Sequence, residues 1–196
     1  MDDRVKAAEM KFLASGREDV DVRMLGSGRP FAFECVNPRK TRFTQEELLE
    51  LEEHINSHHK GVVVNSLQVV TKEDIKKLKE GEEEKRKRYT ALCVTAEPCP
   101  DNMFCKLEKM TDLTLHQETP IRVLHRRSNA IREKVVHNMK VEREGLKDNM
   151  FKLLVSTSAG TYVKEFVYGD FSRTVPNVGS LLGCSADILA LDVEEV

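Results

Sequence analysis

The sequence predicts an α+β fold, with a mixed, mostly antiparallel sheet and flanking helices. Segments with strand periodicity outnumber helical segments along the chain. Several of these strand segments follow one another through turns, as in hairpins, and helical segments occur between them only occasionally. The length of 196 residues fits one domain with a single core, so residues 1–196 are expected to form one domain.

The first expected strands lie close to the N-terminus. Val20 and Val22 alternate with charged neighbours, which is the period of a strand with one charged face. Gly26, Ser27 and Gly28 predict a turn, and a second short strand is expected at residues 31–36. These two strands and the turn between them predict a hairpin.

Two helices and a further strand are expected before residue 85. Thr44 and Glu47 have the spacing of a capping box, which predicts an amphipathic helix reaching about residue 57. β-branched residues predict a strand over residues 61–70. Thr71 follows and is expected to cap a second helix.

The remaining expected elements are mainly strands. A short helix is predicted over residues 162–168, after a turn that contains Gly160. Residues 98–110 and 173–183 carry proline, glycine or asparagine and are expected to be loops. Strands are expected at residues 89–96, 121–124, 135–141, 151–157 and 188–193.

The composition excludes several classes of protein. No apolar run reaches the ~18 residues of a membrane-spanning helix, so no membrane partner is expected. Residues 1–12 are charged and lack the apolar stretch of a signal peptide. The five cysteines are an odd number without Cys-x-x-Cys spacing, which argues against a disulfide framework. An intracellular location, in the nucleus or the cytoplasm, is therefore expected.

The net charge of −2 is not that of a basic nucleic-acid-binding domain. The charges are nevertheless clustered, since residues 39–42, 85–88 and 122–132 are basic and residues 46–53 and 80–84 are acidic. This pattern is compatible with a local basic cleft.

A strip of alternating charges at residues 17–23 is the most informative feature of the chain. Asp19 and Asp21 lie two residues apart on the expected strand, between Arg17 and Arg23. Neighbouring cations favour the ionised form of a carboxylate, which suits a nucleophile better than a general acid. The alternative is an exposed strand edge with solvated ion pairs.

Three further segments carry residues of chemical interest. Tyr89 opens an apolar strand directly after a basic run, where half-buried packing is the alternative role. Arg122, His125, Arg126 and Arg127 place guanidinium groups together, which suits phosphate oxygens. Lys164 lies in the first turn of the helix expected at residues 162–168 and could face a carboxylate on a neighbouring strand, or snorkel to the surface.

The order of these segments resembles the motif series of pseudouridine synthases: Gly-Arg-x-Asp, a tyrosine that opens a strand, and Gly-Thr-Tyr-x-Lys. Residues 16–26, 28–31, 119–127, 160–170, 173–174 and 176–180 resemble more narrowly the THUMP-containing tRNA pseudouridine synthase of archaea and eukaryotes, which modifies T-loop uridines. The resemblance covers roughly residues 15–193. It implies the catalytic core of that family as the fold, and tRNA as the partner.

Transferred residue by residue, the resemblance implies a role for each matching position. Asp19 matches the nucleophile of the Gly-Arg-x-Asp pattern, whereas Asp21 does not. Tyr89 matches the aromatic residue that stacks on the flipped uracil, and Lys164 matches the basic residue that pairs with the catalytic aspartate. Arg17 matches a position that is linked, in the wider superfamily, to the place in the base stack that the flipped-out nucleotide leaves. The RNA-binding candidates are Arg17, Arg122, His125, Arg126 and Arg127.

The resemblance also implies what the reaction needs. It is an isomerisation, so no metal and no cofactor is expected. The family has an N-terminal RNA-binding region with paired cysteines for zinc, and an opening strand of the core, that are absent from these 196 residues. The chain is therefore expected to be an N-terminally truncated catalytic domain.

Other functions remain as alternatives at the level of sequence. A non-catalytic RNA-binding or protein-interaction fragment that retains the synthase fold is the main one. A metal-dependent phosphohydrolase built on Asp19 and Asp21 is a weaker one. Cys99, Cys105 and His116 do not have the spacing of a familiar zinc site.

Overall fold

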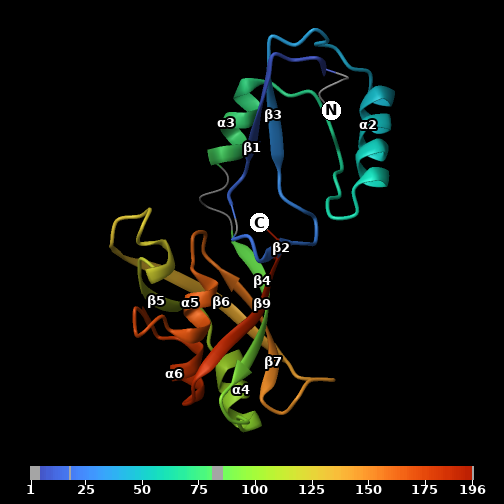
Figure 1. Ribbon diagram of the computed structural model, residues 1–196. Helices are drawn as coiled ribbons and strands as arrows, with labels where there is room; N and C mark the ends of the chain where they lie inside the picture. The colour runs from blue at the N-terminus through green and yellow to red at the C-terminus, as the bar shows by residue number, and fades with distance from the viewer. Residues whose placement is uncertain (1–4, 18, 81–85, 196) are drawn as a thin grey trace. The chain divides into compact units, whose positions relative to one another are not determined.

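A computed structural model of the chain describes residues 5–17, 19–80 and 86–195 (Figure 1). These residues divide into two compact units, each described here by itself. The first unit contains the residues up to Ser15 together with residues 30–80, and the second unit contains residues 16–29 and those after residue 80. The sequence predicted one domain with a single core. The cluster of buried core residues lies in the second unit.

The second unit is built on a seven-stranded sheet with the order β2-β9-β4-β7-β6-β5-β8. Neighbouring strands are antiparallel, except that β2 pairs in parallel with β9. This arrangement confirms the predicted α+β class and the mixed, mostly antiparallel sheet. The strands are β2 (Val22–Met24), β4 (Lys87–Thr95), β5 (Leu113–Glu118), β6 (Ile131–Glu142), β7 (Met150–Thr157), β8 (Thr174–Val175) and β9 (Ala186–Glu195).

Three short helices contribute to the core of this sheet: α4 (Asp101–Glu108), α5 (Val163–Tyr168) and α6 (Val178–Leu182). Alternate residues of β4 are buried, from Lys87 to Thr95, so one face of this central strand is covered. The helices add apolar side chains to the core that also holds Phe151 and Leu153 of β7. These helical side chains are Phe104, Leu107, Val163, Phe166, Val167, Val178 and Leu182.

The first unit pairs β1 (Glu9–Ala14) with β3 (Phe31–Val36) and adds helices α2 (Gln45–His58) and α3 (Lys72–Glu80). The predicted capping box is present, because the Thr44 hydroxyl accepts from the Glu47 N–H and the Glu47 carboxylate accepts from the Thr44 N–H. Asp74 and Thr71 make the same kind of reciprocal contact at the start of α3. Both helices predicted in this part of the sequence are therefore confirmed.

The predicted hairpin of residues 20–23 with residues 31–36 is wrong. Residues 19–21 form a turn, in which the Val22 N–H donates to the Asp19 carbonyl oxygen at 3.1 Å, and β2 begins only at Val22. β2 pairs with β9 and β3 pairs with β1, and neither pairing is predicted by the local sequence. The Arg23 guanidinium forms an ion pair with Asp192 of β9, a partner 169 residues away. Local alternation cannot reveal pairing over such a separation.

Residues 61–70, predicted as a strand, do not form one. Side chains of α2 bind part of this backbone instead of a neighbouring strand. The Asn56 amide makes two hydrogen bonds of 2.8 Å with the backbone of Val64, and the Leu67 N–H donates to the Glu52 carboxylate. Backbone groups that are hydrogen-bonded to side chains do not need a neighbouring strand as their partner, so a β-branched segment of this kind can lie outside a sheet.

Two predicted loops contain regular elements, and one predicted strand is a helical turn. Residues 98–110 include α4, which begins after Pro100, and residues 173–183 include β8 and α6. Asn177 and Ser180 form a capping box at α6, so an asparagine that is typical of loops here begins a helix. Residues 121–124, predicted as a strand, contain the 3₁₀ helix η1 (Ile121–Val123). The predicted strands at 89–96, 135–141, 151–157 and 188–193 are confirmed as parts of β4, β6, β7 and β9.

No helix in the part of the chain that the structure describes is both long and apolar enough to cross a membrane.

The turn after β2 depends on a glycine that touches β9. Gly26 has a positive φ of 61°, and a Cβ atom there would lie 2.0 Å from the backbone oxygen of Glu194. Gly28 also has a positive φ, of 82°, but a Cβ atom there would have no neighbour within 4 Å.

We expect Gly26→Ala to lower the free energy of unfolding by about 3 kcal/mol, because a left-handed backbone and a steric clash both oppose it. The matched control Gly28→Ala adds only the backbone cost, about 1–2 kcal/mol. Urea-induced unfolding followed by circular dichroism measures both variants. Equal losses for the two variants would contradict the close approach of this turn to β9.

Candidate functional site

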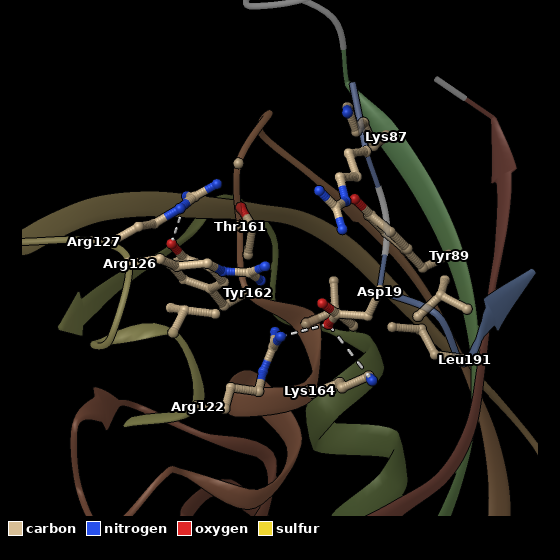
Figure 2. Close-up of a pocket in the computed structure, with 15 residues that line it drawn as sticks. Asp19, Lys87, Tyr89, Arg122, Arg126, Arg127, Thr161, Tyr162, Lys164 and Leu191 are labelled. Carbon is tan, nitrogen blue, oxygen red and sulfur yellow. Dashed lines mark hydrogen bonds and ion pairs between the residues drawn. The ribbon is translucent and has the colours of Figure 1, made fainter. Parts of the chain in front are cut away.

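A cavity of about 320 Å³ lies within the second unit, at the end of the sheet where several chain segments meet (Figure 2). Its wall comes from the segment before β2, from β4 and β9, from η1 and the residues after it, and from the turn that leads into α5. The volume is within the range of ~300–1,000 Å³ that is typical of ligand sites.

Asp19 lies at the centre of this wall. Its carboxylate Oδ2 is 2.5 Å from Nη1 of Arg122 and 3.7 Å from Nζ of Lys164, and its side chain is 28% exposed. Figure 2 shows the carboxylate between these two cations. A carboxylate that is partly exposed to the cavity and held in place by two cations is suited to act as a nucleophile.

Arg122 is held from two sides. The N–H of Ile121, at the start of η1, donates to the carboxylate of Asp170 at 3.0 Å, which fixes the backbone beside Arg122. The guanidinium then binds Glu165 through Nε at 2.7 Å and through Nη2 at 3.4 Å. Burial opposes the charged form, but the hydrogen bond and charge of Glu165, together with Asp19, raise the pKa of Arg122 above its ordinary value. Arg122 is therefore a permanent cation at this position.

Lys164 divides its contacts between the two aspartates of the charged strip. Its Nζ lies 2.7 Å from both carboxylate oxygens of Asp21, closer than the 3.7 Å to Asp19. The Asp21 side chain is 65% exposed, whereas that of Lys164 is 16% exposed. The hydrogen bond from Lys164 lowers the pKa of Asp21, although partial burial works in the opposite direction. The resemblance implied that Lys164 pairs with Asp19, and here Asp21 is its nearer partner.

The start of α5 is fixed by a buried glutamine. Gln117 of β5, 1% exposed, donates from Nε2 to the Tyr162 carbonyl and accepts the Tyr162 N–H through Oε1, at 3.0 and 2.9 Å. Gly160 supplies a positive φ of 72° just before, and the Thr161 hydroxyl donates to the Ser158 carbonyl. These bonds hold the Gly-Thr-Tyr turn, so the residues that follow it enter the cavity wall at a fixed place.

An apolar surface faces the charged residues. Tyr89 of β4 is only 5% exposed and is opposite Val193 of β9, while Leu191 of β9 also lines the cavity. In Figure 2, Tyr89 and Leu191 lie on the side away from Arg126 and Arg127. A flat aromatic ring held in a sheet is a suitable surface for a nucleobase to stack on.

Basic side chains form further parts of the wall, with Arg126 and Arg127 on the side away from Tyr89 (Figure 2). Arg17, Arg126 and Arg127 line the cavity, and Nη1 of Arg127 donates to the Tyr162 hydroxyl at 2.9 Å. The structure thus brings Asp19, Tyr89, Lys164 and Arg122 to the same cavity as these three arginines. His125 is exposed and does not belong to the cavity wall.

Several residues of the site are not among the candidates that the sequence predicts. Lys87 lines the cavity and is only 8% exposed, although it belongs to the basic run of residues 85–88. Its position two residues before Tyr89, on the same face of a strand, is the signal that places it there. Tyr162, Leu191 and Glu165 were also missed. The burial of Glu165 inside an apolar helix has no signature in the sequence.

The cysteines of the second unit are not part of the cavity wall. Cys99 Sγ is 2.9 Å from Cys184 Sγ, and Cys105 is exposed. Among the described residues, no group of three or more histidine, cysteine, aspartate or glutamate side chains could hold a metal ion.

Comparison with known proteins gives consistent matches over the whole chain. Residues 1–196 match the family described as "Pus10, C-terminal". The chain is 51% identical to the tRNA pseudouridine synthase Pus10 of Homo sapiens and 50% identical to that of Mus musculus, in each case over 97% of this chain and 36% of the relative. It is 38% identical to the Pus10 of Methanosphaera stadtmanae, over 95% of this chain and 44% of that protein. The chain therefore spans less than half the length of these curated relatives.

The contact between Lys164 and Asp21 can be tested by titration. Asp21 is expected to titrate below its ordinary value of 3.8. A carboxyl pKa that is lowered in the fold adds stability at neutral pH, and this contribution is lost as the pH falls through the folded value. In Lys164→Met the Asp21 midpoint should rise, whereas in the control Arg23→Met it should not move. Carboxyl ¹³C NMR measures each midpoint, and an Asp21 midpoint that is the same with and without Lys164 would refute the pairing.

Proposed function

This chain belongs to the Pus10 C-terminal family, and from this premise we propose that its cavity isomerises uridine to pseudouridine in tRNA, with Asp19 as the nucleophile. T-loop uridines are the proposed target. The observation that carries the proposal is the position of Asp19: a carboxylate bound by the two cations Arg122 and Lys164, in a cavity with the ring of Tyr89 in its wall.

The proposed reaction begins when the target nucleotide leaves its stack. A uridine within a folded tRNA loop has to be extruded into the cavity, at a cost of a few kcal/mol. Stacking on Tyr89 would return about 1–3 kcal/mol of this. Tyr89 is suited to this role because the strand pairing on both sides of β4 holds its ring in place.

The chemical steps follow from the placement of Asp19. Its carboxylate attacks either C1′ of the ribose or the pyrimidine ring, and the bond between N1 and C1′ breaks. The uracil then rotates, and C5 forms the new bond to C1′. The bond between the Asp19 carboxylate and the substrate breaks with its electron pair returning to the carboxylate, so Asp19 is regenerated. C5 loses its proton, for which Tyr89 is the candidate acceptor, and N1 gains one. The atoms of substrate and product are the same, so no redox equivalent or nucleotide is consumed.

The proposed role of Arg122 differs from the one suggested by its sequence neighbours. Beside Arg126 and Arg127 it looked like a phosphate ligand, but its guanidinium is engaged by Glu165 and Asp19. We assign it to Asp19, whose negative charge it stabilises. Arg17, Arg126 and Arg127 then remain as the groups that bind the tRNA backbone.

A second candidate function is an RNA-binding fragment without catalysis. It is favoured by the three arginines that line the cavity, Arg17, Arg126 and Arg127, which suit a phosphate backbone whether or not a reaction follows. In this case the arginines of the cavity would bind RNA and no pseudouridine would form.

The catalytic proposal predicts that Asp19→Ala abolishes pseudouridine formation and leaves RNA affinity within about twofold, because phosphate contacts are made elsewhere. The assay is release of tritium from tRNA labelled at uridine C5, with affinity measured by filter binding. Asp21→Ala, at the neighbouring aspartate, should retain turnover at a reduced rate, and the exposed Asp148→Ala serves as the unaffected control.

The outcomes of this assay separate the two candidate functions. Release by the unmodified chain and none by Asp19→Ala would support the synthase and its nucleophile. Release by Asp19→Ala at the normal rate would reject Asp19 as nucleophile. No release by any variant, together with tight tRNA binding, would favour the binding fragment.

The basic side of the cavity generates a separate prediction about binding. Arg126→Ala and Arg127→Ala should each weaken tRNA binding and lower the slope of log affinity against log salt by roughly one, as expected for a lost phosphate contact. Lys109→Ala, on the exposed C-terminal end of α4, should change neither quantity. Binding isotherms at three or more salt concentrations give the slopes, and slopes that match that of the unmodified chain would exclude these arginines as phosphate ligands.

A further inference from the structure

Beyond the residues that line the cavity, a buried carboxylate lies behind it. Glu165 is 1% exposed and follows Lys164 in α5. A charged group buried to this degree is stable only when it is paired and hydrogen-bonded. Its carboxylate accepts bonds from Arg122 through Nε at 2.7 Å and Nη2 at 3.4 Å, and from the Tyr168 hydroxyl at 3.0 Å.

The geometry of Arg122 makes this pairing relevant to Asp19. The guanidinium is planar, and its nitrogens lie at fixed angles to one another. Glu165 occupies the edge formed by Nε and Nη2, and Asp19 is bound by the remaining nitrogen, Nη1, at 2.5 Å. Once one edge of the fork is fixed by a buried carboxylate, the direction of the third nitrogen is fixed as well.

We propose that Glu165 is a positioning residue: it holds Arg122 so that Nη1 meets the Asp19 carboxylate, and it does so without touching the substrate. This inference rests on the proposed function, in which Asp19 is the nucleophile. It adds a residue whose charge and hydrogen bonds act on the reaction through Arg122.

Two features of the surroundings support a positioning role. The pKa of Tyr168 is raised, mainly by burial and next by the negative charge of Glu165. The Tyr168 hydroxyl therefore stays protonated and remains a donor to Glu165. Lys164, the other cation at Asp19, is hydrogen-bonded to Asp21. Each cation that contacts Asp19 is thus also bound by a second carboxylate. The contacts form a series of alternating charges in the order Asp21, Lys164, Asp19, Arg122 and Glu165.

A purely structural role for Glu165 is the competing explanation. In that case the carboxylate would neutralise Arg122 and stabilise α5, and its loss would lower stability without a specific effect on the reaction. The two explanations differ in whether Glu165 and Arg122 act on turnover as one unit.

The test is a double-mutant cycle on the 196-residue chain with Glu165→Gln, Arg122→Lys and both together. Glu165→Gln removes the negative charge at nearly constant shape, and Arg122→Lys keeps the cation but removes the fork. We expect each single variant to lower kcat about a hundredfold, because the Asp19 carboxylate would no longer be held in its reactive position. KM should stay within about twofold of that of the unmodified chain. The double variant should lose no more than either single variant, because both remove the same contact.

Control measurements keep a folding defect apart from a loss of positioning. Thermal unfolding is recorded for every variant, and Glu118→Gln, which alters another carboxylate paired with an arginine, should leave kcat unchanged. If Glu165→Gln does not fold, Glu165→Asp takes its place, since it keeps the buried charge and withdraws the carboxylate from Arg122. Turnover of Glu165→Asp equal to that of the unmodified chain would then overturn the proposal.

A readout independent of activity distinguishes failure of this inference from failure of the proposed function. In the unmodified chain the side-chain N–H signals of Arg122 should be resolved and slow to exchange with water, and in Glu165→Gln they should broaden. Additive losses of kcat, or Arg122 signals that are unchanged in Glu165→Gln, would overturn the positioning role. If the unmodified chain shows no turnover but the Arg122 signals do depend on Glu165, the proposed synthase activity is rejected. The contact by which Glu165 holds Arg122 is then supported on its own.

Discussion

The guanidinium of Arg122, bound on one edge by Glu165 and at its third nitrogen by Asp19, is the contact on which the rest of the site depends. It joins three segments that are distant in the chain: the turn before β2, the 3₁₀ helix η1 and the helix α5. Two carboxylates share one cation, and the buried one is also satisfied by the Tyr168 hydroxyl. Burial strengthens these interactions, because the surroundings screen charge less than water does. The exposed pair of Lys164 with Asp21 is the weaker part of the same series, since solvent reaches most of the Asp21 side chain.

The sheet is what makes this contact possible. β2 has only three residues, yet its parallel pairing with β9 fixes the turn that carries Asp19 beside the central strand β4. β5 supplies Gln117, which binds both backbone groups of Tyr162 and so fixes where α5 begins. The acidic strip and the Gly-Thr-Tyr turn are thus each held by a strand distant from them in the chain. Side chains placed by such strands keep their geometry more reliably than side chains on unsupported loops.

Many elements of the fold could be predicted from local sequence. The capping box at Thr44 and the alternation in β4, β6 and β7 depend on neighbours within a few residues, and these elements are confirmed. The errors share a cause, which is that the deciding partner lies far along the chain. Residues 20–23 alternate like a strand, but β2 is set by β9; residues 61–70 look like a strand, but side chains of α2 bind part of their backbone. Residues 121–124 are predicted as a strand, but they contain η1, whose start is held by Asp170, 49 residues away.

For the site, the sequence by itself determined which residue types are available and in what order: the aspartates of the strip, the tyrosine that opens β4, the arginines after η1 and the lysine of α5. The resemblance of those motifs to a family also selected Asp19 over Asp21. How the charges are paired depends on the folded chain. Arg122 turned out to face Asp19 and Glu165, Lys164 lies nearer to Asp21, Glu165 is buried, and His125 is outside the cavity. The physical reason is that the pairing of charges depends on distance and burial, and both are properties of the packed chain that no local pattern encodes.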